Sequence, residues 1–285
     1  MENEIFFTKH YNLNIQEKDL EFIDIPLNTD IKKFVDPYAI SKAEGVFFVE
    51  ANNLIVDFFE HIVNVIRDGD DIKALSLMDK LREPNETRFG LSQNKPEGRG
   101  VGNEQSKDLL KKFKQSKALQ TGYLSDLSDC ELLIPGIGSD KISDITINII
   151  RGKLVDFTEQ QCKKHGIPVS SVKTGHYWDD ISHKWTQRIA MLPNYNGKMI
   201  LLVPKFIARG KTISNYLDYY NKGILPFLQD YHLDLNTSLV KTLKNGKRRV
   251  TKKDLRAQYK CSKDFVLEFS AKNPTVLQKY KNSRV

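Results

Sequence analysis

The chain has 285 residues, of which 40% are hydrophobic and 28% are charged, as in ordinary globular proteins. No apolar run approaches the roughly 18 residues that a membrane-spanning helix needs, and the N-terminus, MENEIFFTKH, is acidic where a signal peptide would be basic. Three cysteines at unrelated spacings argue against a disulfide framework. We therefore expect a cytoplasmic protein with no membrane partner.

The net charge of +8 is unevenly distributed along the chain. Residues 241–285 contain 14 Lys or Arg and 3 Asp or Glu, a net charge of +11, whereas residues 1–240 contain 30 and 33. Clustered positive charge favours a polyanion partner, because phosphate binding needs several cations close together. We therefore expect a core domain, 1–240, and a basic nucleic-acid-binding segment, 241–285. A lysine-rich face that contacts only solvent is the alternative.

The first half of the chain is dominated by helical spacing. Residues 1–36 mix short apolar and polar pieces, which indicates one or two edge strands. Apolar residues from Leu54 to Ile66 recur at helical spacing and predict a long amphipathic helix that ends near Arg67. Asp70 can cap a second, antiparallel helix. A third helix is predicted over residues 106–118.

The segment EPNETRFGLSQNKPEGRGVGNEQ precedes that third helix. Glu86 lies where the second helix has ended, Arg88 follows it, and Arg99 lies among the glycines at 98, 100 and 102. Glycines before a helix N-terminus let backbone N–H groups point at an anion, so this loop could hold a phosphate group with Arg88 and Arg99 beside it. A surface loop that needs glycine for its turns is the alternative.

The stretch DCELLIPGIGSDKISD, residues 129–144, reads as a buried strand that turns sharply into a helix. Leu132 to Ile134 are apolar, one proline and two glycines follow, and a strongly periodic helix covers 144–165. Asp129, Asp140 and Asp144 bracket the turn. An acid in the first turn of a helix is also stabilised by the helix dipole alone, which is the structural alternative for Asp144.

The last third of the chain contains a second predicted strand and the basic segment. The run KMILLVPKFI predicts a buried strand that ends near Pro204 and leaves Lys205 at its terminus. The sequence KNGKRRVTKKDLRAQYK then predicts a tight turn at Asn245 and Gly246, followed by a helix capped by Thr251. We expect phosphate contacts with little sequence reading from the cations of this run: Lys247, Arg248, Arg249, Lys252 and Lys253.

These elements predict an α+β fold. Single apolar strands lie among long amphipathic helices, so we expect a small mixed sheet that includes 130–135 and 199–205. The helices near 53–67, 106–118 and 144–165 should cover it.

A helix-end glutamate, a strand-turn aspartate and a strand-end lysine in this order resemble the restriction-endonuclease-like superfamily, the PD-(D/E)XK nucleases. The resemblance implies a mixed sheet flanked by helices and a metal-dependent nuclease that acts on DNA or RNA, with prokaryotic anti-phage defence among its expected roles. Glu86, Asp129 and Asp144 would be catalytic and hold Mg²⁺ or Mn²⁺, and Lys205 would be the catalytic lysine. Val203 stands where that family has an acid or glutamine two residues before the lysine.

Two other classes of function fit the same residues. In a non-catalytic nucleic-acid-binding subunit, the basic segment would provide the affinity and the acids would be caps and ion-pair partners. In an adaptor of a larger complex, the basic segment would bind an acidic protein. Cleavage that depends on Mg²⁺ distinguishes the first class, and salt-sensitive binding without cleavage distinguishes the second.

Overall fold

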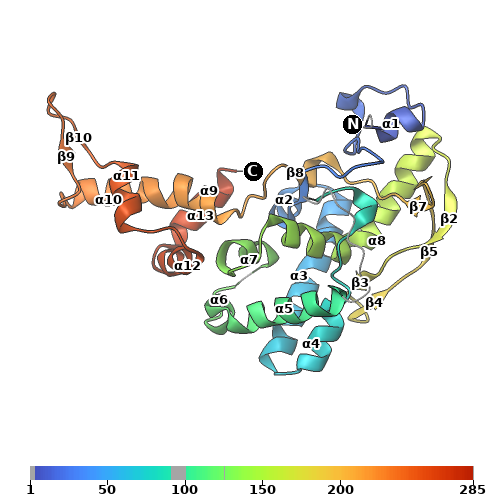
Figure 1. Cartoon of the computed structure of the whole chain (residues 1–285), viewed down its shortest axis with the longest axis horizontal. Helices are drawn as coiled ribbons and strands as arrows, with labels where there is room; N and C mark the ends of the chain where they lie inside the picture. Colours follow the sequence, from blue (N-terminus) through green and yellow to red (C-terminus); the bar gives the residue numbers. More distant parts are fainter. Residues whose placement is uncertain (1–3, 91–100, 125, 285) are drawn as a thin grey trace. The chain divides into compact units, whose positions relative to one another are not determined.

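The computed structural model of the protein describes residues 4–90, 101–124 and 126–284 (Figure 1). The chain forms two compact units. Unit 1 comprises Met1–Lys114 and Gly138–Thr212, and unit 2 comprises Gln115–Ile137 and Ile213–Val285. The charge distribution predicted that the basic segment 241–285 is separate from the rest of the chain. The structure differs from this prediction. The basic segment folds together with 115–137 and 213–240.

Unit 1 contains the longest helices and most of the strands. Its helices are α1 (Phe7–His10), α2 (Pro37–Lys42), α3 (Val46–Arg67), α4 (Asp71–Met78), α5 (Val101–Gln115, whose last residue belongs to unit 2) and α8 (Ser139–His165), with 3₁₀ turns at Glu17–Asp19, Asn85–Thr87 and Lys205–Ile207. Its strands are β1 (Phe34–Val35), β2 (Ser170–Lys173), β3 (Tyr177–Asp179), β4 (Lys184–Thr186), β5 (Ile189–Leu192), β6 (Asn194–Tyr195), β7 (Lys198–Met199) and β8 (Ala208–Arg209).

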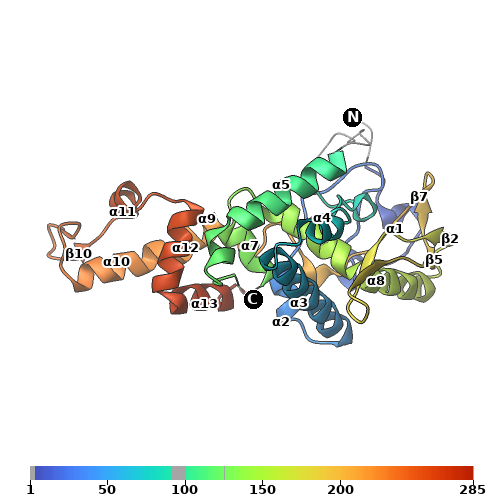
Figure 2. The same ribbon diagram turned by 90° about the horizontal axis from the view of Figure 1, so that it is seen from below.

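Helix α8 is the central element of unit 1. Every residue from Ile142 to Arg151 is buried, which is typical of a helix that packs on all sides. Its second half packs against β5 around Val155 and Leu192 (Figure 2). The helix ends at Gly166, which has a φ of 65°, a left-handed conformation that glycine adopts without strain.

The α+β class is confirmed, but the strands do not form the single mixed sheet that we expected. They form separate antiparallel pairs, namely β1–β8, β2–β5, β3–β4, β6–β7 and β9–β10. The expected helices near 53–67, 106–118 and 144–165 correspond to α3, α5 and α8. In the described residues no helix is both long and apolar enough to cross a membrane.

The first predicted central strand is wrong, and the second is only partly formed. Residues 127–133 form helix α7, which begins where the Asp126 carboxylate accepts a hydrogen bond from the backbone N–H of Asp129 at 3.0 Å. Every residue of α7 is buried, so its apolar run shows no alternation that would separate a helix from a strand. The second segment is not a continuous strand, because β7 ends at Met199 and only Pro204 pairs again, in an isolated antiparallel bridge with Phe22. The backbone N–H of Leu201 instead donates to the Glu86 carbonyl, and that of Leu202 donates to the Thr158 hydroxyl.

Unit 2 is helical apart from one hairpin. Its elements are α6 (Lys117–Gln120), α7 (Leu127–Leu133), α9 (Tyr216–Tyr219), a π-helical turn (Tyr220–Ile224), α10 (Leu225–Asp234), β9 (Lys241–Thr242), β10 (Arg248–Arg249), α11 (Lys252–Gln258), α12 (Lys263–Lys272) and α13 (Pro274–Asn282). The turn at Gly246 and the Thr251 cap of α11 are as predicted. Gly223 does not interrupt the helix. It lets the Tyr219 ring approach, since a Cβ there would lie 2.6 Å from that ring.

Candidate functional site

Four carboxylates act on one another in unit 1. Asp140 and Asp144 lie in the first turns of α8, and Glu83 and Glu86 lie in the segment after α4. The side chain of Asp144 is 9% exposed, and Lys141 is its ion-pair partner, with Nζ 3.8 Å from Oδ2. The pKa of Asp144 is raised to about 8, mainly by burial. The other three acids also raise this pKa, and Lys141 lowers it. Asp144 therefore keeps its proton at neutral pH.

Glu86 is held by an arginine from α8. The Glu86 Oε1 atom lies 2.7 Å from Nε of Arg151, and the two side chains are 12% and 6% exposed. The same guanidinium donates to the backbone carbonyl of His176. Gly175 leaves room for it, since a Cβ there would lie 2.8 Å from the Arg151 Cζ atom. This ion pair neutralises the Glu86 charge and fixes the segment after α4 to α8.

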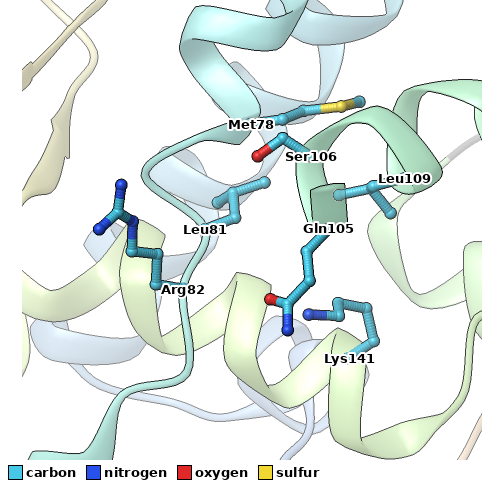
Figure 3. Close-up of a pocket in the computed structure, with 7 residues that line it drawn as sticks. All are labelled: Met78, Leu81, Arg82, Gln105, Ser106, Leu109 and Lys141. Atoms are coloured by element: carbon cyan, nitrogen blue, oxygen red, sulfur yellow. The ribbon is translucent and has the colours of Figure 1, made fainter. Parts of the chain in front are cut away.

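A small pocket of about 10 Å³, room for one water molecule, lies in unit 1 and includes Lys141, the partner of Asp144 (Figure 3). Met78, Leu81 and Leu109 provide its apolar wall, and its polar lining residues are Arg82, Gln105, Ser106 and Lys141. The amide end of Gln105 points toward the ammonium end of Lys141 (Figure 3). Asp79 accepts hydrogen bonds from Arg82 at 3.1 and 3.2 Å, so this cation is already neutralised.

Lys205 and Asp129 have partners of their own. Lys205 opens a 3₁₀ turn, and its ammonium donates to the backbone carbonyl of Glu17. It is not among the charged groups that shift the pKa of Asp144. Asp129 belongs to unit 2, where Nζ of Lys281 lies 2.6 Å from its Oδ1 atom. Both side chains of this pair are buried, so it fastens α13 to α7.

Each carboxylate of the predicted metal site has a cationic partner within its own unit. Asp129 and Glu86 are each neutralised by a buried cation, and Oδ2 of Asp144 lies 3.8 Å from Nζ of Lys141. In the described parts of the chain, no three His, Cys, Asp or Glu side chains are placed to hold a metal ion. The acids present do not fit Mg²⁺ or Mn²⁺, which need several ionised oxygen ligands around one point.

The strongest concentration of charge lies in unit 2. This unit contains 16 Lys or Arg and 9 Asp or Glu, so it carries +7 of the total charge of +8. Many of these cations lie on the β9–β10 hairpin and on α11. We call Lys244, Lys247, Arg248, Arg249 and Lys253 the hairpin surface, and all five side chains are exposed.

The partners of these cations fall into two groups. Within the described residues, no carboxylate forms an ion pair with Lys244, Lys247, Arg249 or Lys253, whereas Lys241 pairs with Asp254 at 2.6 Å. Asp254 also attracts Lys253, its neighbour in the sequence, at longer range. Other cations are held by uncharged oxygen atoms. Arg248 donates to the Asn236 amide at 3.2 Å, and Lys252 and Arg256 donate to the carbonyl and amide oxygens of Asn221 at 2.9 and 2.8 Å. These contacts fix the side chains without removing their charge.

The two arginines predicted from the glycine-rich segment differ in outcome. Arg88 has a left-handed φ of 56°, and its side chain is 17% exposed. Its Nη1 atom lies 4.0 Å from Oδ1 of Asp30, so the guanidinium already has an anionic partner in unit 1. Arg99 and the glycines at 98 and 100 lie outside the described residues.

Sequence reasoning missed the residues that position the charged groups. Asn221 orients Arg256 from 35 positions away, and Lys281 neutralises Asp129 from 152 positions away. Lys263 was missed as well, although its ammonium donates to the carbonyl oxygens of Glu131, Ile134 and Ile137 around the end of α7. No local pattern connects such partners. Lys244, in contrast, lies in the same basic run as Lys247 and could have been included.

Comparison with known proteins identifies a family but no function. No curated protein and no solved structure matches the chain. The model of a domain of unknown function, DUF8370, matches residues 12–215, which is more than half of the chain. The hairpin surface lies outside the matched residues. The chain belongs to the DUF8370 family.

Proposed function

We propose that the protein binds nucleic acid through the hairpin surface of unit 2, by contacts with the phosphate backbone. The observation that carries the proposal is the set of four exposed cations, Lys244, Lys247, Arg249 and Lys253, that form no ion pair with a carboxylate in the described residues. A patch of this kind attracts a polyanion and releases the counterions condensed on it.

The pairing within the hairpin supports this proposal. Arg249 lies directly opposite Lys241 in the β9–β10 ladder, and like charges in that position destabilise a hairpin. Asp254, which pairs with Lys241 at 2.6 Å, offsets part of this repulsion, and the named strands contain only two residues each. A charge arrangement that weakens the isolated hairpin becomes favourable when a row of phosphates lies between and beside the cations.

The cations held by Asn221 and Asn236 strengthen the surface. Lys252, Arg256 and Arg248 keep their full charge because their partners are amide and carbonyl oxygens. Their side chains lose less conformational freedom on binding, since they are already ordered. Hydrolysis is not part of the proposal, because Glu86, Asp129, Asp144 and Lys205 each have a partner or protonation state that serves the fold.

Binding measurements at several salt concentrations test the proposal. The variant replaces Lys247, Arg249 and Lys253 by Ala, and the matched control replaces three exposed lysines of unit 1 by Ala, namely Lys163, Lys173 and Lys184. Both variants lose three positive charges. Affinity for a labelled DNA or RNA oligonucleotide is measured by fluorescence anisotropy between 50 and 200 mM salt.

The three contacts should contribute about 0.9 each to the slope of log affinity against log salt. The slope of the hairpin variant should therefore be smaller than that of the parent by about 2.7. Over this fourfold range of salt, the parent's affinity should then decrease by a factor about 40 times larger than the variant's. The control should keep the parent's slope. Equal losses in both variants, or no binding by the parent at low salt, would refute the proposal.

A further inference from the structure

We infer that the β9–β10 hairpin enters the major groove of duplex DNA. This inference rests on the proposed function and narrows the ligand to B-form duplex. The structural basis is a two-stranded antiparallel ribbon whose residues 244–249 are all exposed. The major groove of B-form DNA is about 12 Å wide and admits such a ribbon.

The hairpin has the form of a closed tip on a fixed base. At the tip, the backbone N–H of Leu243 donates to the Lys247 carbonyl at 2.9 Å, and that of Gly246 donates to the Leu243 carbonyl at 2.9 Å. At the base, Val250 is buried, and its carbonyl accepts from the Gln229 side chain of α10 at 2.6 Å. Within unit 2 the tip projects beyond the end of α10 (Figures 1 and 2). It can therefore reach into a groove while its base stays packed.

The cations lie on both faces of this ribbon. Side chains alternate along a strand, so Lys247 and Arg249 share one face while Arg248, opposite Thr242, lies on the other. The major groove is bounded by a phosphate backbone on each side, and a ribbon inside it meets both. A single strand lying across the hairpin would contact the cations of one face. The two-sided arrangement thus favours a groove.

The hairpin itself offers no stacking platform for unpaired bases. Residues 241–250 read KTLKNGKRRV and contain no aromatic side chain. Proteins that bind single strands without sequence preference usually stack bases on aromatic rings. A-form RNA duplexes are disfavoured for a different reason, since their major groove is deep and too narrow for side chains to enter. Duplex DNA is the remaining ligand of matching shape.

The test compares four labelled ligands of the same sequence and length with the full-length protein at one salt concentration. These are a DNA duplex, the same duplex with its cytosines glucosylated through 5-hydroxymethyl groups, an RNA duplex and a single DNA strand. The sugar fills the major groove without changing the charge. We expect the unmodified DNA duplex to bind roughly tenfold or more tightly than the other three, and netropsin in the minor groove to leave its affinity unchanged.

The outcomes separate this inference from the proposed function. If the Lys247, Arg249 and Lys253 variant weakens binding but the glucosylated duplex or the RNA duplex binds as tightly as plain DNA, phosphate binding stands and groove entry is refuted. Tighter binding to the single strand refutes it as well. If the variant and the parent bind every ligand equally, the proposed function fails and the inference fails with it.

Discussion

Replacing Asp144 by Asn should stabilise unit 1, and the gain should grow with pH. Burial raises the pKa of this carboxyl to about 8, from a value of 3.8 for an unperturbed aspartate. Between these two pH values the folded protein keeps a proton that the unfolded chain releases, so the Asp144 contribution to stability falls as pH rises. Asparagine has nearly the same shape and does not titrate, so the variant avoids this loss.

The magnitude follows from the shift in pKa. One pH unit inside this window is worth about 1.4 kcal/mol. From pH 5 to pH 7 the difference in unfolding free energy between the variant and the parent should therefore increase by about 2.5 kcal/mol. Other titrating groups are shared by the two proteins and cancel from the difference.

Tryptophan fluorescence during urea unfolding is the appropriate assay, because both tryptophans, Trp178 and Trp185, lie in unit 1 with Asp144. Asp180→Asn is the control, since it removes a carboxylate from an exposed position of the same unit. A destabilised Asp144→Asn protein, or a difference that does not change with pH, would contradict the reasoning. Either result would mean that Asp144 is ionised and stabilised by Lys141.

Four further outcomes are expected. Lys281→Met should destabilise unit 2 by roughly 3–5 kcal/mol because Asp129 is left buried without its cation, and hydrogen exchange in α7 and α13 should accelerate. Lys263→Met should cost about 1–3 kcal/mol and expose the end of α7 to exchange, since three carbonyls lose their donor. Asp57→Ala should cost a similar, roughly 1–3 kcal/mol and shift the tryptophan emission, because Nε1 of Trp178 donates to Asp57 at 2.6 Å, whereas Asp57→Asn should retain much of the bond. Added Mg²⁺ should weaken nucleic-acid binding as a competing counterion, and EDTA should not abolish it; binding that requires Mg²⁺ would point back to a metal site.

Local sequence patterns predicted several of the helices of this fold. The spacing of apolar residues predicted α3 and α8, and the side chains of Asp70 and Thr251 cap α4 and α11 as expected. These features depend on residues within a few positions of one another, which a single sequence contains in full. The tight turn at Gly246 was predicted for the same reason.

The failures concern buried segments and distant partners. Residues 127–133 and 200–203 are buried apolar runs, and such runs do not reveal whether their backbone bonds are helical, paired in a sheet or made to loops. The nuclease resemblance depended on bringing Glu86, Asp129, Asp144 and Lys205 together. In the structure, Glu86 pairs with Arg151, Asp129 with Lys281, and Asp144 with Lys141, while Lys205 donates to the Glu17 carbonyl. All of these partners except Lys141 are far away in the sequence and come close only through tertiary packing.

The sequence showed that the hairpin surface is positively charged, but it did not show which of its cations are held by hydrogen bonds and which are not. The basic run predicted phosphate contacts from Lys247 to Lys253 without distinction. The structure separates Lys247, Arg249 and Lys253, which form no ion pair with a carboxylate in the described residues, from Arg248 and Lys252, which are held by uncharged oxygen atoms. That difference depends on Asn221 and Asn236, whose roles only the fold defines.

Lysine reactivity with and without DNA tests the central claim most directly. The full-length protein is acylated briefly, alone and in the presence of a saturating DNA duplex, and each lysine is quantified by mass spectrometry. Lys244, Lys247 and Lys253 should be strongly protected by DNA, while Lys163, Lys173 and Lys184, which are also exposed, should react as in the protein alone. Protection confined to the lysines of unit 1, with the three hairpin-surface lysines as reactive as before, would contradict the account.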